Sequence, residues 1–222
     1  MSDSLQKAWD GTRWYTNPFL IIYDWFALGF TCRFIWGCKS KNIVDLYNKH
    51  VSGNHLDIGC GTGYFLDKCR FPNNNPLLTL VDLNPYSLEI TKKRLARYKP
   101  KIYARDILKP LDIGSNGFDS IGLTHLLHCL PGNMESKGIV LRNLKTILNP
   151  GGVIFGSTFM STGTNQNIIT KIMFWLTNRI GFMTNRQDDI EGLSRILKYH
   201  FSEYHIDIIG CEILFWARTA NY

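Results

Sequence analysis

A glycine-rich turn is the clearest candidate for chemistry in this sequence. The run LDIGCGTGYFL at 56–66 leads from apolar residues into Gly59, Gly61 and Gly63 and then into a helix-like segment. Glycines suit such a tight turn because they adopt backbone angles that a Cβ disfavours, and they let the main chain approach a bulky ligand closely. The spacing is not that of the dinucleotide pattern GxGxxG, because Tyr64 occupies the position of its last glycine.

Three carboxylates follow the first three predicted strands. Asp57 stands just before the glycine turn, where it would repel a pyrophosphate but can pair with an ammonium group, and this disfavours a nicotinamide dinucleotide. Asp82 ends the second strand, where an acid can accept hydrogen bonds from both hydroxyls of a ribose. Asp106 ends the third strand. Asp57 or Asp106 could instead be a helix cap or a surface acid, an alternative that suits Asp82 less well.

Two histidines follow the fourth predicted strand, in the run FDSIGLTHLLHCL at 118–130. His128 is the first candidate for a general base and His125 the second, although a histidine in this place is often only packed or bonded to the main chain. Thr124 is placed to line a ligand at the carboxyl end of the strand. The six cysteines form no CxxC pair and no zinc spacing, so we expect no metal site.

These residues are framed by alternating strand-like and helix-like segments, which indicate an α/β sheet with mostly parallel strands. With 222 residues, 45% of them hydrophobic, the chain can bury one sizeable core. Strands are predicted at 55–59, 77–82, 101–106, 118–124 and 153–159. Helices are predicted at 62–70, from Pro85 to Pro100, and at about 134–148, 168–180 and 188–200. The final segment, 203–219, reads as a β-hairpin that turns at Gly210.

Taken together, these motifs resemble the class I S-adenosylmethionine-dependent methyltransferases of the small-molecule type. The resemblance covers about residues 50–219 and includes NPGG at 149–152 before the fifth strand. His128 stands at the first histidine of a family motif ending LHHL, and Cys129 replaces the second. The resemblance implies a Rossmann-like seven-stranded sheet, mostly parallel, with a C-terminal antiparallel hairpin, helices on both faces and an N-terminal helical cap.

The resemblance also implies an S-adenosylmethionine site at the carboxyl ends of the strands. Its amino-acid end would be held by Asp57 and the backbone of the glycine turn, its ribose by Asp82, its adenine by Asp106 and two flanking apolar residues, and its methionine portion by Thr124. The expected cofactor-binding residues are Asp57, Gly59, Cys60, Gly61, Gly63, Asp82, Leu83, Asp106, Ile107 and Thr124. The product would be S-adenosylhomocysteine, and no metal is required.

An aromatic cap and a second aromatic segment are expected to cover the acceptor. We predict a cap or lid over 1–48 and a cofactor-binding domain over 49–222, with a lid insertion near 160–187. Tyr23 and Asp24 look like a Tyr-Asp pair that lies near the active site in several small-molecule families, so Tyr23 is a third catalytic candidate. The alternative is that this pair only packs the cap on the sheet. The aromatic covers favour a small apolar or aromatic acceptor.

Other functions stay open from the sequence. The net charge of +7 and the basic residues around 168–183 allow a phospholipid N-methyltransferase that acts on ethanolamine headgroups, or peripheral membrane contact alone. A nucleic-acid methyltransferase is disfavoured because THLLH replaces an Asn/Asp-Pro-Pro-Tyr motif, and a non-catalytic binding protein because the glycine turn is intact. Residues 19–36 contain Asp24 and Arg33 and are not a membrane span. The N-terminus lacks a secretory pattern, so we expect a cytoplasmic protein.

Overall fold

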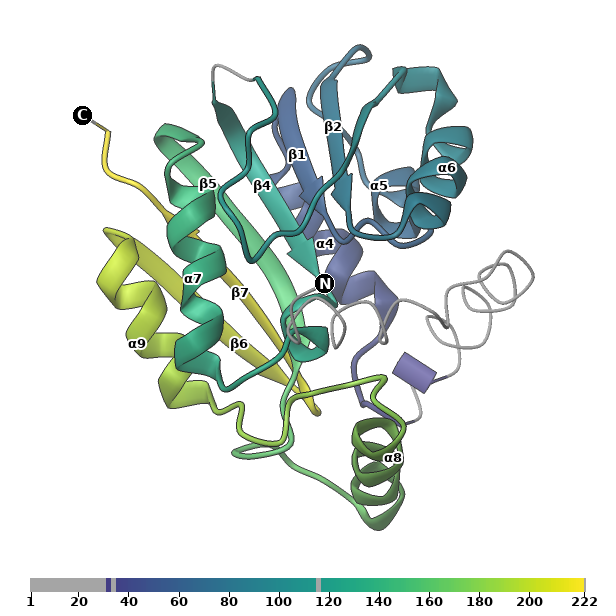
Figure 1. Ribbon diagram of the computed structural model, residues 1–222, viewed down its shortest axis with the longest axis vertical. Helices are drawn as coiled ribbons and strands as arrows, with labels where there is room; N and C mark the ends of the chain where they lie inside the picture. The colour runs from purple at the N-terminus through teal and green to yellow at the C-terminus, as the bar shows by residue number, and fades with distance from the viewer. Residues whose placement is uncertain (1–30, 33–34, 115–116, 222) are drawn as a thin grey trace.

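The computed structural model describes residues 31–32, 35–114 and 117–221 (Figure 1). Tyr23, Asp24 and most of the expected cap over 1–48 therefore lie outside the described residues. The expected boundary at residue 48 falls within a helix, α4, which spans Ser40–His50 and packs against the sheet.

A seven-stranded sheet forms the centre of the structure, in the order β3-β2-β1-β4-β5-β7-β6 (Figure 1). The pairs among the first five strands are parallel, whereas β7 runs antiparallel to both of its neighbours. This arrangement confirms the predicted fold class. The strands are β1 (Asn54–Ile58), β2 (Leu77–Asp82), β3 (Lys101–Ala104), β4 (Phe118–Thr124), β5 (Leu148–Phe159), β6 (Glu203–Ile209) and β7 (Glu212–Arg218).

Helices cover both faces of the sheet. In Figure 1, α7 and α9 lie side by side in front of the strands and α4 lies behind them. Asparagine or aspartate caps four of the helices through a side-chain oxygen, as Asn84 does by accepting from the Tyr86 N–H at 2.9 Å. Besides α4, the helices are α5 (Tyr64–Lys68), α6 (Pro85–Arg94), α7 (Met134–Lys145), α8 (Ile168–Arg179) and α9 (Ile190–His200), with single turns η2 (Ala96–Tyr98) and η3 (Leu127–Cys129).

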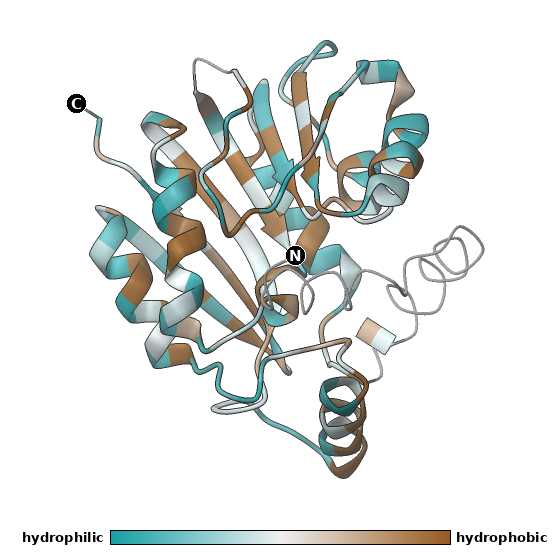
Figure 2. Ribbon diagram, in the orientation of Figure 1, coloured by the Kyte–Doolittle hydropathy of each residue, from teal (hydrophilic) through white to brown (hydrophobic). Residues whose placement is uncertain are grey.

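The alternation of side chains along each strand divides the apolar core in two. On β7, Ile213 and Phe215 belong to the cluster under α7 and α9, whereas Leu214 between them belongs to the cluster under α4 and α5. Such two-sided burial gives nearly continuous apolar strands, which Figure 2 shows as hydrophobic bands through the sheet. Because β1 to β5 pair in parallel, their carboxyl ends lie at one common edge of the sheet.

Several predicted boundaries are wrong. β3 ends at Ala104 and not at residue 106, and α6 ends at Arg94, short of Pro100. The largest difference lies before β5. The sequence predicts a helix that continues to residue 148 and a strand that starts at 153, but α7 ends at Lys145 and β5 already begins at Leu148. The NPGG residues lie inside the strand because the main chain there finds partners: Leu148 pairs with Phe118, and the Gly151 N–H donates to the Ala220 carbonyl at 2.9 Å. A register shift between Phe118 and Ser120 accommodates the extra residues.

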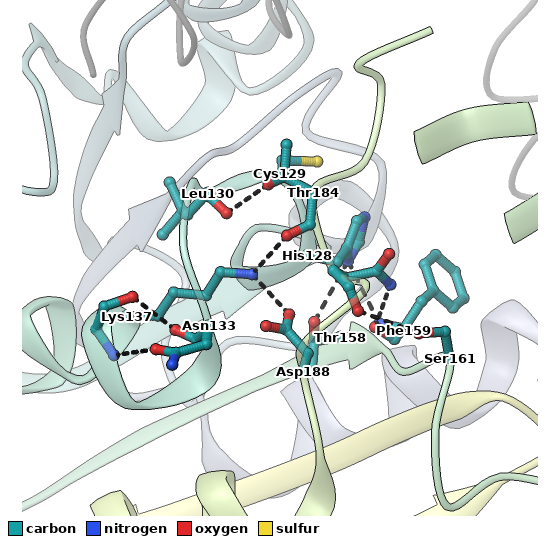
Figure 3. Close-up of polar contacts among 12 residues, drawn as sticks. His128, Cys129, Leu130, Asn133, Lys137, Thr158, Phe159, Ser161, Thr184 and Asp188 are labelled. Carbon is teal, nitrogen blue, oxygen red and sulfur yellow. Dashed lines mark hydrogen bonds and ion pairs between the residues drawn. The ribbon is translucent and has the colours of Figure 1, made fainter. Parts of the chain in front are cut away.

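A buried ion pair attaches the segment after α8 to the body of the domain (Figure 3). The Lys137 ammonium lies 2.6 Å from the Asp188 carboxylate, and both side chains are completely buried. Nearby, the Thr184 N–H donates to the His128 carbonyl at 2.8 Å. These contacts fix residues 184–188, which follow α8, against α7 and η3.

Removing one member of this pair is expected to destabilise the fold strongly. Lys137→Met leaves the Asp188 carboxylate buried without its cation and should lower the free energy of unfolding in urea by about 3–5 kcal/mol. The double variant Lys137→Met, Asp188→Leu should lose much less than the two single variants together. Lys145→Met, at an exposed position of the same helix, is the control and should change stability by less than about 0.5 kcal/mol. Additive losses would contradict a direct interaction.

Candidate active site

A pocket opens at the carboxyl edge of the sheet, where the strand order reverses direction. β1 pairs in parallel with β2 on one side and with β4 on the other, and such a switch point leaves a crevice beyond the strand ends. The structure brings all ten expected cofactor-binding residues together there. The pocket is lined by Asp57, Gly59, Cys60, Gly61, Gly63, Asp82, Leu83, Asp106, Ile107 and Thr124, among others.

The glycine turn requires its glycines for two reasons. Gly59, Gly61 and Gly63 have φ of 67°, 55° and 73°, which side chains other than glycine rarely adopt. A Cβ on Gly63 would also lie 2.7 Å from the Thr91 side chain. Thr91 in turn donates its hydroxyl to the Gly61 carbonyl at 3.0 Å, which fixes α6 against the turn. The turn is thus a rigid main-chain wall of the pocket.

Asp57 is held by a residue that the sequence analysis missed. The Tyr47 hydroxyl on α4 donates to Asp57 Oδ2 at 2.7 Å, and both side chains are almost fully buried. Burial and the neighbouring Asp57 charge raise the pKa of Tyr47 well above its usual value, so Tyr47 stays a donor. The apolar spacing of residues 40–50 would have predicted the helix, but nothing local indicates that its tyrosine reaches the first strand.

Asp82 points its carboxylate into the pocket from the end of β2. Oδ1 accepts from the Asn84 N–H at 2.8 Å, and Oδ2 lies 3.4 Å from the Gly61 N–H. Burial raises the pKa of Asp82 to about 6, although these main-chain hydrogen bonds oppose the rise. The remaining lone pairs can accept two hydroxyls, which suits a ribose better than a phosphate.

Two apolar residues and one acid beyond β2 and β3 also line the pocket. They are Leu83, Ile107 and Asp106, and Asp106 accepts from the Leu108 N–H at 3.0 Å, which closes a local turn. Apolar side chains and a carboxylate suit an aromatic base that carries an amino group. Together with the cradle of glycines, this donor set fits S-adenosylmethionine.

His125 forms the wall of the pocket next to Thr124. It has a φ of 56°, which is uncommon for a residue with a side chain, and its ring stacks on Phe159 at 4.9 Å between centroids. The His125 Nε2 lies 2.6 Å from Glu212 Oε1. Because β7 is antiparallel, its first residue, Glu212, pairs with Phe159 at the end of β5 and so reaches the edge where β4 ends.

Glu212 is the second functional candidate that the sequence analysis missed. Its side chain is fully buried, and its other oxygen, Oε2, has no hydrogen-bond partner in the described part of the chain. A glutamate that opens the otherwise apolar strand EILFWA was the available signal. A fully buried carboxylate needs a partner, and the imidazole of His125 supplies it.

Cys32 joins His125 and Glu212 in one group of potential metal ligands, whose atoms lie within 4.8 Å of one another. Two ligands of one zinc ion stand about 3.3 Å apart at tetrahedral angles. The observed 2.6 Å between His125 and Glu212 is instead a hydrogen bond. Burial also raises the pKa of the Cys32 thiol far above its usual value, which leaves it protonated. The geometry fits a hydrogen-bonded acid–base pair better than a metal site.

His128, the first candidate for a general base, is not brought into the pocket. It lies on η3 with only 3% of its surface exposed, and the Phe159 N–H donates to its Nδ1 at 3.3 Å (Figure 3). Burial lowers the pKa of His128 well below its usual value, so the ring is neutral. Only His125 of the two histidines lines the pocket, which reverses the predicted order of the two candidates.

Comparisons with known proteins identify the family of the chain. A family model described as a methyltransferase domain matches residues 56–154. Demethylluteothin O-methyltransferase of Streptomyces thioluteus is 36% identical over 97% of this chain and 94% of its own length. The physcion biosynthesis cluster O-methyltransferase of Aspergillus chevalieri is 34% identical over 90% of this chain and 91% of its own length.

A solved structure shows the same fold. The N-methyltransferase NodS of Bradyrhizobium japonicum, crystallised with S-adenosyl-L-homocysteine, superimposes with a TM-score of 0.57 at 20% identity, over 81% of this chain and 87% of NodS. The named metabolite relatives give no support to the phospholipid alternative. The chain is therefore an enzyme that belongs to the class I S-adenosylmethionine-dependent methyltransferases acting on small molecules.

Proposed function

We propose that this enzyme methylates an acidic hydroxyl group, phenolic or enolic, on an apolar or aromatic metabolite. The observation that carries the proposal is the 2.6 Å hydrogen bond between His125 and buried Glu212 at the pocket wall. A hydroxyl must lose its proton as it attacks a methyl group, so a positioned base is useful for oxygen acceptors. The O-methyltransferase names of the two relatives support this choice.

His125 would act through its second ring nitrogen. With Nε2–H donating to Glu212, Nδ1 is left as the basic atom, and the buried carboxylate stabilises the imidazolium that forms. When bound, S-adenosylmethionine supplies the methyl group: its C–S bond breaks as the O–C bond forms, and the acceptor proton passes to His125. After release of S-adenosylhomocysteine and the methyl ether, His125 would return its proton to solvent.

The cofactor would be oriented by groups at or just beyond the carboxyl ends of four strands, β1 to β4. We assign Asp57 and the backbone of the glycine turn to its amino-acid end, Asp82 to its ribose and Asp106 to its adenine amino group. Thr124 would line the methionine portion beside His125. This placement supplies proximity and alignment, which account for much of the rate in a methyl transfer.

Apolar residues would receive the acceptor and exclude water. Phe65 and Leu130 line the pocket near His125, and the Phe65 ring meets His125 edge-on at 5.7 Å. We also propose that residues 160–187 form a lid and that residues 1–48 form a cap that brings Tyr23 to the acceptor.

We further propose that the enzyme is located in the cytoplasm.

Loss of the Asp82 charge should weaken cofactor binding. Asp82→Asn removes the charged acceptor of the ribose hydroxyls and should raise the Kd for S-adenosylmethionine about 10-fold to 100-fold, as measured by calorimetry. Asp112→Asn, an exposed acid outside the pocket, is the matched control and should bind as the unaltered chain does. Equal affinities for the two variants would remove Asp82 from the site.

Cofactor affinity should also fall in mild acid. Because the pKa of Asp82 is raised to about 6, the carboxylate accepts the ribose hydroxyls above that pH and is lost as an acceptor below it. We expect the Kd for S-adenosylhomocysteine to rise as the pH falls through about 6, by at most tenfold per pH unit. Asp82→Asn should flatten this dependence. A pH-independent Kd in the unaltered chain would contradict the assignment.

Changes to the histidine–glutamate pair should affect turnover more than cofactor binding. His125→Ala should lower kcat about 10²-fold to 10⁴-fold, and Glu212→Gln should lower it less, because the ring loses its orienting charge but keeps a hydrogen bond. Transfer of labelled methyl from S-adenosylmethionine to demethylluteothin or a simple phenol measures kcat, and calorimetry measures cofactor Kd. His205→Gln, exposed on β6, is the control. Unchanged kcat in His125→Ala would refute the proposed base.

A further inference from the structure

The outer face of α8 is apolar and exposed. Large apolar side chains on this helix remain about half exposed or more: Ile168 76%, Ile169 60%, Ile172 56%, Trp175 57% and Leu176 41%. At 100° per residue they fall within an arc of about 120°, which is the width of a face that normally packs on a core. In Figure 2 this helix stands away from the sheet and carries both hydrophobic and hydrophilic segments.

The opposite face of α8 already has its partners. Phe174 is buried against Trp36, with ring centroids 4.8 Å apart, and the Thr170 hydroxyl donates to the Ile35 carbonyl at 3.0 Å. The remaining exposed large apolar side chains of the described residues are scattered over other elements, apart from Ile180 at the end of α8. A contiguous apolar patch of this kind marks an interaction surface.

Charge indicates the kind of partner. The lid segment, 160–187, contains Lys171, Arg179 and Arg186 but no aspartate or glutamate. All three basic residues are exposed, and the Arg179 guanidinium lies 5.4 Å from the centre of the Trp175 ring. Apolar residues, a tryptophan and basic residues on one exposed helix face are typical of helices that lie in the headgroup region of an anionic membrane.

A second copy of the chain fits this face less well. A twofold contact through α8 would bring Lys171 and Arg179 of one copy near the same residues of the other, with no acid in the segment to offset them. Among the described residues, no helix is both long enough and apolar enough to cross a bilayer. We propose that α8 docks the enzyme on the surface of an anionic membrane, with the helix lying parallel to it.

The test is sedimentation of the full chain with vesicles, without methyl acceptor. The chain should sediment with vesicles of equimolar phosphatidylcholine and phosphatidylglycerol, but much less with phosphatidylcholine alone, and added salt should weaken the binding. Ile172→Asp should weaken it at least tenfold, because a charge replaces a buried apolar group. Lys171→Gln with Arg179→Gln should weaken it about 25-fold, at about fivefold per basic residue lost.

Controls separate docking from folding and from the proposed chemistry. Ile208→Asp makes the same substitution at a side chain of similar exposure, 52%, on β6, and should bind vesicles as the unaltered chain does. Cofactor affinity, measured by calorimetry, should be unchanged in each variant. If Ile172→Asp loses cofactor affinity, its fold is damaged, and the double charge variant and the salt dependence then decide whether α8 docks on the membrane. Absence of binding to anionic vesicles would overturn the proposal. The proposal would also be overturned if the unaltered chain were a dimer, Ile172→Asp dissociated this dimer, and vesicles bound neither the dimer nor the variant.

Discussion

Parallel pairing of β1 with both β2 and β4 is the constraint on which the site depends. It forces the connections after β1 and β4 to leave the sheet in different directions, so a crevice remains beyond their carboxyl ends. Residues at the ends of separate strands, such as Asp57, Asp82 and Thr124, then meet around one ligand. The positive φ angles of the glycine turn are a consequence, because the chain must reverse within a few residues without filling the crevice.

The reversal of β7 completes the site from the far end of the chain. If β7 ran parallel to β5, its first residue would lie at the opposite edge of the sheet. Because β7 is antiparallel to β5, Glu212 instead lies opposite Phe159, within hydrogen-bond distance of His125. The C-terminal hairpin thus contributes the carboxylate that contacts the candidate base, and Phe159 packs against both histidine rings.

Much of the fold and of the cofactor site could be predicted because their determinants are local. The alternation of strand and helix patterns, the glycine turn and the acid at each strand end are all visible within short stretches of sequence. Tyr47 and the Lys137–Asp188 pair could not be predicted, because each acts through a partner on another element. Glu212 stood out as an acid in an apolar strand, but its partner His125 is far away in the sequence. The places of the two histidine rings depend on the fold as well: His125 lines the pocket, whereas His128 is buried on η3.

A crystal structure of the full chain with S-adenosylhomocysteine tests the central claim most directly. The account predicts the adenine between Leu83 and Ile107, the ribose hydroxyls on Asp82, and the sulfur atom on the side of Thr124 with His125 facing the space beyond it. A product bound elsewhere, or a sulfur atom turned away from His125, would contradict the proposed arrangement for methyl transfer.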